Sequence, residues 1–169
     1  LHCPLLSDLN AHLIRSAFIA SLAIAICCPL TAAAGNQSQL IQRLENGEHQ
    51  TIVYFGTSLT KFDGWSQQVT SRLEAMYPGQ ITTVNSGIAG GVSSTGRSLL
   101  NTLVLNHEPD AVFIEWAIND SHVDLNISVA QSRSNLEYMI NQISALSNDP
   151  SIILQTTNPA WNAPGGSNG

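Results

Sequence analysis

The chain has 169 residues, of which 43% are hydrophobic and 11% are charged, and its formal net charge is −6. This length suits one domain, and the apolar content excludes a disordered chain, which has too few apolar side chains to offset its ordering entropy. The acidic balance excludes a nucleic-acid-binding surface, because phosphate binding needs clustered basic side chains and only 6 Lys and Arg residues are present.

The N-terminal segment has the features of a secretory signal peptide. An uncharged apolar run at residues 17–30 follows Arg15 and leads to an A-x-A ending at Ala32 and Ala34. The run is shorter than the roughly 20 apolar residues of a membrane span, so we expect a secreted or periplasmic protein with no stable membrane anchor. A buried or anchoring helix is the alternative interpretation. We therefore divide the chain into an upstream segment with a signal peptide, residues 1–34, and a domain at residues 35–169.

All three cysteines, Cys3, Cys27 and Cys28, fall in the segment that we expect to be removed. A mature chain without cysteine would have no disulfide, no thiolate nucleophile and no Cys-ligated metal. A lipoprotein anchor on Cys27 or Cys28 is not expected, because the residue before each, Ile26 and Cys27, is not the small residue that such processing sites carry.

From residue 35 onward, apolar strands alternate with amphipathic helices. Short apolar runs predict strands, and apolar residues at helical spacing predict helices. We expect strands at 51–55, 81–85, 111–116 and 151–157, and helices at 39–44, 65–76, 99–104 and 129–146. A capping box of Ser128 and Gln131 precedes the last helix. This order predicts an α/β fold, a three-layer α/β/α sandwich whose parallel sheet is covered on both faces.

Small and polar residues follow each predicted strand. In open α/β sheets, ligands bind beyond the carboxyl ends of the strands. The segments 56–60, 85–91, 117–120 and 157–159 carry hydroxyls, glycines and amides but no Lys or Arg. This chemistry favours a neutral polar substrate and a developing oxyanion over a phosphate group.

Three residues in these segments are candidate catalytic groups. Ser58 lies just past Gly56 at a strand-to-loop turn, where its hydroxyl can be exposed as a nucleophile and its N–H can face the reacting carbon. Gly87 can offer an unobstructed backbone N–H, and Asn119 can offer a side-chain N–H. Three donors that converge on one point would form an oxyanion hole. Glu115, inside a predicted strand, is interpreted as a paired structural carboxylate rather than an acid catalyst.

These segments resemble the sequence blocks of the SGNH/GDSL hydrolases. Residues 56–60 (GTSLT) resemble the first block, GDSL, with Thr57 in place of Asp. Residues 85–87 (NSG) resemble the second block, and residues 117–120 (AIND) resemble the third, GxND, with Ala117 in place of Gly. The blocks come in the family's order, each at the end of a predicted strand, within a resemblance that runs from residue 51 to about residue 157.

The resemblance implies a flavodoxin-like sandwich and a secreted serine esterase that needs no metal and no cofactor. Ser58 would attack the ester carbonyl, while the Ser58 N–H, the Gly87 N–H and the Asn119 side chain would hold the oxyanion. The expected substrate is a small-molecule or carbohydrate ester, with O-acetylated carbohydrate as one candidate.

The family's fourth block, Asp-x-x-His, supplies a general base and the aspartate that orients it, and no part of this sequence matches that block. The chain also ends on a strand and a loop. We therefore expect the domain to be incomplete at its C-terminus, with the catalytic Asp and His outside this chain and the fragment inactive as given. Past Gly87, the remaining histidines are His107, expected to be a solvated helix cap, and His122, which could lie near the site as a weak candidate base.

Two alternatives stay open at this point. Residues 56–60 also resemble the hydroxyl-rich phosphate loop of an FMN carrier, although the second glycine of that loop is missing, so a non-enzymatic flavodoxin-like binding domain is the competing class. Among the hydrolases, a lipase or thioesterase would have apolar residues near Ser58.

Overall fold

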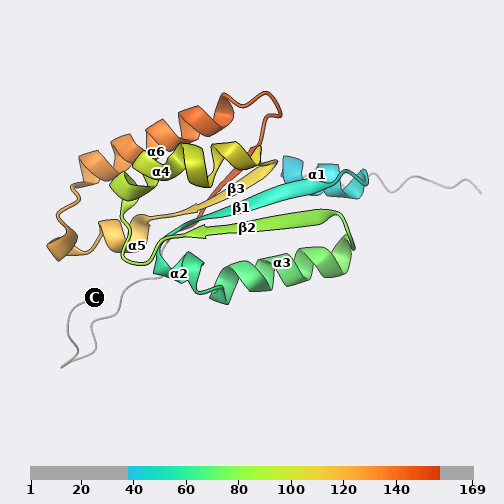
Figure 1. The fold of residues 1–169 in the computed structure, drawn as a ribbon, viewed down its shortest axis with the longest axis horizontal. Helices are drawn as coiled ribbons and strands as arrows, with labels where there is room; N and C mark the ends of the chain where they lie inside the picture. Colours follow the sequence, from blue (N-terminus) through green and yellow to red (C-terminus); the bar gives the residue numbers. More distant parts are fainter. Residues whose placement is uncertain (1–37, 157–169) are drawn as a thin grey trace, which may run out of the picture. The chain divides into compact units, whose positions relative to one another are not determined.

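The computed structural model describes residues 38–156, and within them one parallel sheet forms the centre of the fold. The predicted signal peptide, the cysteines and the loop at 157–159 lie outside the described residues, so the boundary between residues 34 and 35 stays a prediction. The sheet has the strand order β2-β1-β3-β4 (Figure 1). Its strands are β1 (Gln50–Gly56), β2 (Ile81–Gly87), β3 (Ala111–Glu115) and β4 (Ser151–Leu154).

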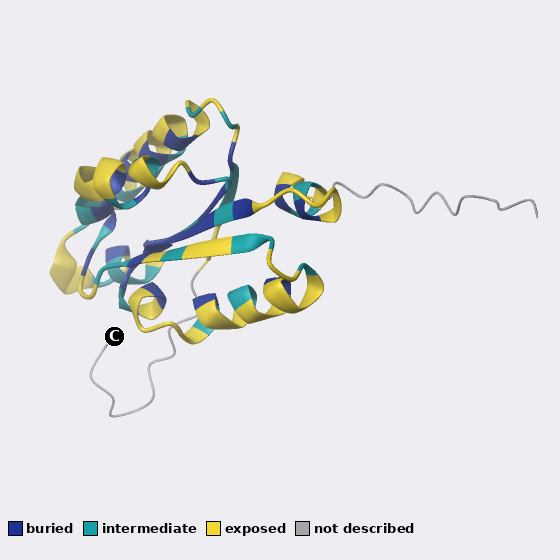
Figure 2. Ribbon diagram, turned by 45° about the vertical axis from the view of Figure 1, so that its right-hand side comes forward, coloured by how far each residue is buried: buried dark blue, intermediate teal, exposed yellow. Residues whose placement is uncertain are grey.

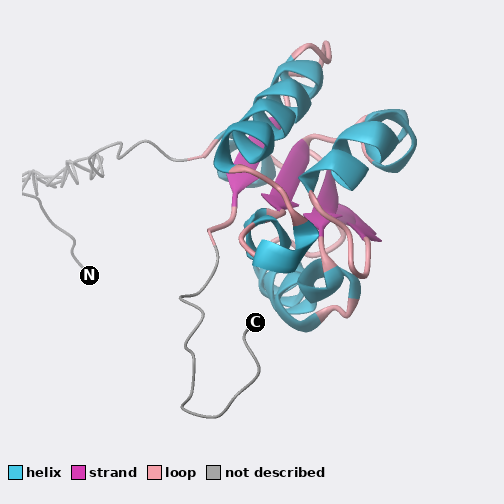
Figure 3. Cartoon of the chain, turned by 90° about the vertical axis from the view of Figure 1, so that its left-hand side faces the viewer, coloured by secondary structure: helices cyan, strands magenta, loops and turns pink. Residues whose placement is uncertain are grey.

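Helices cover both faces of this sheet, as the end-on view in Figure 3 shows. The longer helices are α1 (Gln39–Glu45), α3 (Gly64–Met76), α4 (Ser93–Leu103) and α6 (Val129–Ser144). Side chains alternate along a strand, so Ile52 and Tyr54 of β1 pack in a cluster with α1 and α3, while Val53 and Phe55 pack in a second cluster with α4 and α6. The predicted three-layer α/β/α sandwich is therefore confirmed.

Burial is greatest at the centre of the sheet and falls toward its edges (Figure 2). The β1 strand lies between β2 and β3, and nearly all of its residues are buried. The β2 strand is an edge strand, and its Thr82 and Thr83 are exposed. The Tyr54 hydroxyl shares a 2.9 Å hydrogen bond with Thr70, and burial raises the pKa of this phenol. The first candidate segment, residues 56–60, thus begins at the end of this deeply buried strand.

The observed element bounds differ from the predicted ones in informative ways. The helix expected at 99–104 begins earlier, at Ser93. The prediction missed this start because the first turn of the helix is polar and carries no apolar periodicity. The capping interaction predicted for Ser128 is present, since its hydroxyl accepts from the Gln131 N–H at 3.2 Å. Four single-turn elements were not predicted, because one turn is too short to leave a periodic pattern. They are α2 (Ser58–Lys61), η1 (Leu105–His107), α5 (Ala117–Asp120) and η2 (Val123–Leu125).

No helix within residues 38–156 is both long enough and apolar enough to cross a lipid bilayer.

Candidate active site

The strand register brings the three candidate segments to one edge of the sheet. Gly56, at the end of β1, is paired with Gly87 of β2 on one side and with Glu115 of β3 on the other. Ser58 follows Gly56 by two residues, and Asn119 lies in α5, just past β3. In Figure 1 the strands run toward the left-hand end of the sheet, where α2 and α5 both lie. Ser58, Gly87 and Asn119 therefore leave neighbouring strands at the same carboxyl edge.

Ser58 is the first residue of the short helix α2 and is half-buried. Thr57 precedes it with an extended backbone, and its hydroxyl caps the helix by accepting from the Leu59 N–H at 3.3 Å. Among the described residues, the Ser58 hydroxyl has no hydrogen-bond partner. Its oxygen is therefore available to an incoming group.

Glu115 connects β3 to the turn that carries Ser58. Its side chain is only 2% exposed, and its Oε2 accepts from the Thr57 N–H at 3.1 Å, the Thr57 hydroxyl at 2.7 Å and the Thr60 hydroxyl at 3.2 Å. The interpretation of Glu115 as a paired structural carboxylate is confirmed, with hydroxyls and an amide as its partners rather than a cation. Thr57 stands where the first sequence block of the family has Asp. In this turn the carboxylate comes from Glu115 of β3 instead.

Gly87 closely approaches the backbone of α2. A Cβ at this position would lie 2.2 Å from the Lys61 backbone nitrogen and 2.5 Å from the Lys61 Cα, so no larger residue fits without displacing the helix. The Gly87 N–H donates to Asn85 Oδ1 at 2.9 Å. In this structure the Gly87 N–H, which the sequence offers as an oxyanion donor, thus already has an acceptor in the side chain two residues earlier.

Asn119 is half-buried in α5, and its carboxamide nitrogen donates to the Gly91 carbonyl at 2.7 Å. A carboxamide nitrogen carries two hydrogens, so this bond leaves one donor free. The bond also ties α5 to the loop that follows β2. Asn119 is thereby oriented by the loop that begins directly after Gly87.

Asp120 has a structural role that was not predicted from the sequence. It is 8% exposed, its Oδ1 accepts from the Ser93 N–H at the start of α4 at 2.8 Å, and its Oδ2 accepts from the Ser132 hydroxyl of α6. Asn135 donates to the Ser93 hydroxyl at 3.0 Å and extends the network. This carboxylate therefore joins the segment 117–120 to both helices of one layer, which fixes the position of Asn119.

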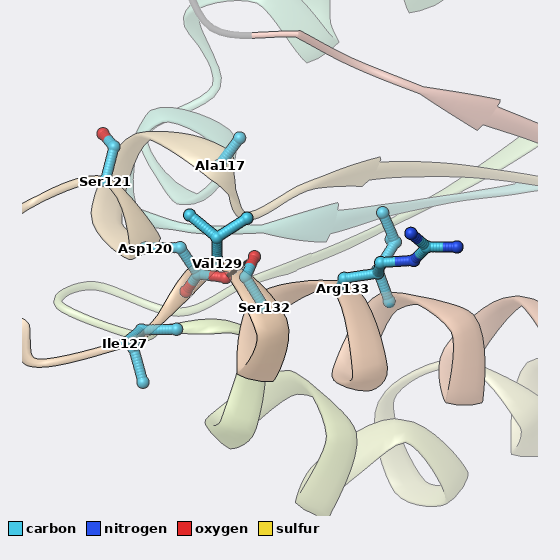
Figure 4. Close-up of a pocket in the computed structure, with 8 residues that line it drawn as sticks. Ala117, Asp120, Ser121, Ile127, Val129, Ser132 and Arg133 are labelled. Atoms are coloured by element: carbon cyan, nitrogen blue, oxygen red, sulfur yellow. Dashed lines mark hydrogen bonds between the residues drawn. The ribbon is translucent and has the colours of Figure 1, made fainter.

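A pocket of about 320 Å³ lies between α5 and the start of α6 (Figure 4). Polar and apolar residues both line it, and Ser58 is not among its lining residues. The lining is Ala117, Asp120, Ser121, Ile127, Val129, Ser132, Arg133 and Leu136. The pocket thus adjoins the segment that carries Asn119.

No described histidine forms a hydrogen bond with Ser58. His49 and His107 precede β1 and β3, at the opposite edge of the sheet from Ser58. His122 follows α5, and its Nδ1 lies 3.3 Å from the Asp124 backbone nitrogen and 3.9 Å from Asp124 Oδ2. The contacts of His122 are thus with its own loop.

No three His, Cys, Asp or Glu side chains in the described part of the chain are grouped so that they could hold a metal ion.

Comparison with known proteins identifies the family to which the chain belongs. A model of the GDSL-like lipase/acylhydrolase family matches residues 32–169. A lipase/acylhydrolase from Enterococcus faecalis has a similar structure, with a TM-score of 0.55 and 34% identity over 62% of this chain and 55% of that chain. An acetylxylan esterase from Geobacillus stearothermophilus shares the fold, with a TM-score of 0.57 and 22% identity over 64% of this chain and 59% of that chain.

A curated relative is the uncharacterized lipoprotein YqeF of Bacillus subtilis, which is 28% identical over 109 residues, or 58% of this chain and 45% of that protein. The chain thus spans only about half the length of these relatives. Because the family match extends over most of the sequence and includes the sheet and all three candidate segments, the chain belongs to the GDSL-like lipase/acylhydrolase family.

Proposed function

We propose that the protein is an exported serine ester hydrolase with Ser58 as its nucleophile. The observation that carries this proposal is the pairing of Gly56 with Gly87 on one side and with Glu115 on the other. This register brings Ser58, Gly87 and Asn119 to one edge of the sheet. The Ser58 hydroxyl at the start of α2, which has no hydrogen-bond partner within residues 38–156, supports the same assignment. Family membership favours this function over a flavodoxin-like binding domain, because the fold alone suits both.

The proposed reaction proceeds in two steps. Ser58 Oγ attacks the ester carbonyl carbon as its proton passes to a general base, and the carbonyl oxygen becomes an oxyanion. The Ser58 N–H and the free Asn119 N–H donate to this oxyanion, and the Gly87 N–H joins them if it exchanges Asn85 for the oxyanion. The tetrahedral intermediate then releases the alcohol, which takes the proton from the base, and water hydrolyses the acyl-enzyme.

The general base comes from outside the described residues. The family resemblance assigns it to the histidine of an Asp-x-x-His block, with the aspartate orienting the imidazole. In the Geobacillus stearothermophilus esterase, solved catalytic mutants replace a serine, an aspartate or a histidine, the last two being three positions apart. A base of this kind would complete the Ser58 site.

The proposed substrate is an acylated carbohydrate, in keeping with the polar segments at the carboxyl edge and with the acetylxylan esterase that shares the fold. One observation favours a second candidate, an ester with an apolar acyl chain. Leu59 and Phe62, which follow Ser58 in sequence, are 52% and 73% exposed, and they form the kind of apolar surroundings expected of a lipase. Relative kcat/KM values for p-nitrophenyl acetate and p-nitrophenyl octanoate distinguish the two, since only the apolar site favours the longer chain.

Export is proposed from the signal-peptide pattern at residues 17–34 and from the relative described as a lipoprotein.

Labelling with a fluorophosphonate tests the nucleophile. In the full-length protein, the probe is expected to modify the tryptic peptide 44–61, in which Ser58 is the only serine. Fragmentation of that peptide locates the modified residue. Prior inactivation with excess unlabelled probe should abolish labelling, and an exposed serine on α4, Ser98, should remain unmodified as an internal control. Modification of another residue, or no modification, would reject Ser58 as the nucleophile.

Replacing Asn119 with alanine is expected to lower kcat by about 10²–10³-fold with little change in KM, because a donor that acts on the developing oxyanion contributes mainly in the transition state. Steady-state kinetics with p-nitrophenyl acetate measure both constants. Asn106→Ala, an exposed asparagine in η1 before β3, is the matched control and should leave both unchanged. An Asn119→Ala enzyme with unchanged kcat would remove Asn119 from the oxyanion hole.

A further inference from the structure

The hydrogen bonds of Glu115 converge on one short segment of the chain. All three donors to its Oε2 belong to Thr57 and Thr60, which flank Ser58 in sequence. The backbone adds a fourth link, because the Thr57 N–H also lies 3.1 Å from the Glu115 carbonyl oxygen. One residue of β3 therefore holds the turn on both sides of the candidate nucleophile.

The carboxylate also fixes the direction of the Thr57 hydroxyl. The Thr57 hydroxyl donates to Glu115 Oε2 across their 2.7 Å contact, so its proton points at the carboxyl group. A lone pair of the same oxygen then faces the Leu59 N–H and caps α2. Glu115 thus acts through Thr57 on the first turn of the helix that begins at Ser58.

The surroundings of Glu115 leave this turn as its main partner. Within residues 38–156, no salt bridge joins Glu115 to a cation, and its buried Oε1 has no hydrogen-bond partner. The backbone opposite makes room for the Glu115 side chain, since a Cβ on Gly56 would lie 2.5 Å from the Glu115 carbonyl oxygen and 2.9 Å from Oε2. The contact therefore depends on a glycine at the end of β1.

From this geometry we infer that Glu115 is a positioning residue for Ser58. It locks the segment 57–60 through Thr57 and Thr60, so that the Ser58 hydroxyl and N–H keep the geometry that attack and oxyanion binding require. This inference rests on the proposed function, because it gives Glu115 a role only if Ser58 is the nucleophile. The inference also explains why Thr57 occupies the position where the family has aspartate. The Thr57 hydroxyl donates to Glu115, whereas an aspartate there would place a second carboxylate beside Glu115, and the two would repel each other.

The test measures turnover per functional site in the full-length protein, with sites counted by fluorophosphonate titration. Glu115→Leu, which removes the acceptor at similar size, and Thr57→Val are expected to lower kcat for p-nitrophenyl acetate by about 10²-fold at unchanged KM, because a misplaced nucleophile reacts slowly even when the substrate is bound. Thr57→Ser, which keeps the hydroxyl donor, is expected to restore kcat close to the wild-type value. The double variant Glu115→Leu with Thr57→Val should lose no more kcat than the more impaired of the two single variants, since both remove the hydrogen bond between Thr57 and Glu115.

Asp110→Asn is the matched control. Asp110 precedes the same strand, β3, at its opposite end, and its carboxylate accepts from the Thr51 N–H of β1 at 2.8 Å. Its kcat per titrated site should equal that of the wild type. Wild-type kcat in Glu115→Leu or Thr57→Val, or a Thr57→Ser enzyme as slow as Thr57→Val, would overturn the inference while Ser58 labelling stands. If Glu115→Leu does not fold, the two Thr57 variants decide alone. A wild-type protein that is not labelled at Ser58 would overturn the proposed function and this inference together.

Discussion

Replacing Ser58 with alanine is expected to lower kcat for ester hydrolysis by on the order of 10⁴–10⁶-fold, because the attacking oxygen is lost and water must replace it. The free energy of unfolding should change by no more than about 0.5 kcal/mol, since the hydroxyl has no partner among the described residues that the variant would leave unpaired. Steady-state kinetics and urea denaturation of the full-length protein measure the two quantities. The combination of lost activity with retained stability is the signature of a nucleophile, because a structural serine would change both or neither.

Ser98→Ala is the control for this prediction. Ser98 is exposed on α4, and its hydroxyl donates to the Thr95 carbonyl at 2.8 Å within the same helix. Both kcat and stability should stay near their wild-type values. A Ser58→Ala protein that retains a tenth or more of the wild-type kcat would assign the chemistry to another group, and the register of the three segments would then have a purely structural explanation.

The fold could be predicted from the sequence because the central strands are strongly apolar. The run Ile52, Val53, Tyr54 and Phe55 is buried on both faces of the sheet, which only a parallel sheet with helices on each side accommodates. The single turns α2 and α5 could not be predicted in the same way. Their positions are set by tertiary hydrogen bonds, such as those of Glu115 and Asp120, rather than by local periodicity.

The position of the candidate site could be predicted, but its internal hydrogen bonds could not. Parallel strands end at one edge, so the residues that follow them must lie near that edge. The partner of the Gly87 N–H depends on the rotamer of Asn85, and the partner of Thr57 depends on a carboxylate 58 residues away in sequence. Neither contact leaves a pattern in a single sequence, because each is fixed only when β1, β2 and β3 are aligned.

That alignment leaves no space for a side chain at Gly87. The missing side chain lets β2 lie against α2, and Asn85 reinforces the contact by donating to the Thr60 carbonyl at 2.9 Å. The Lys61 N–H in turn donates to the Thr57 carbonyl at 3.0 Å. A displacement of Lys61 would therefore pass directly to the turn that carries Ser58.

Gly87→Ala is accordingly expected to lower kcat by at least about 10²-fold and to lower the free energy of unfolding by about 2–3 kcal/mol, because the new methyl group overlaps the Lys61 backbone, which cannot rotate away as a side chain could. Kinetics and urea denaturation measure both effects. Gly64→Ala is the matched control. Gly64 is the first residue of α3, and no atom lies within 4 Å of the position that a Cβ would take there. Alanine at this position should raise the free energy of unfolding by about 0.5–1 kcal/mol without changing kcat. If Gly87→Ala instead keeps wild-type kcat and stability, then α2 tolerates displacement, and the close approach of β2 to α2 does not hold Ser58 in place.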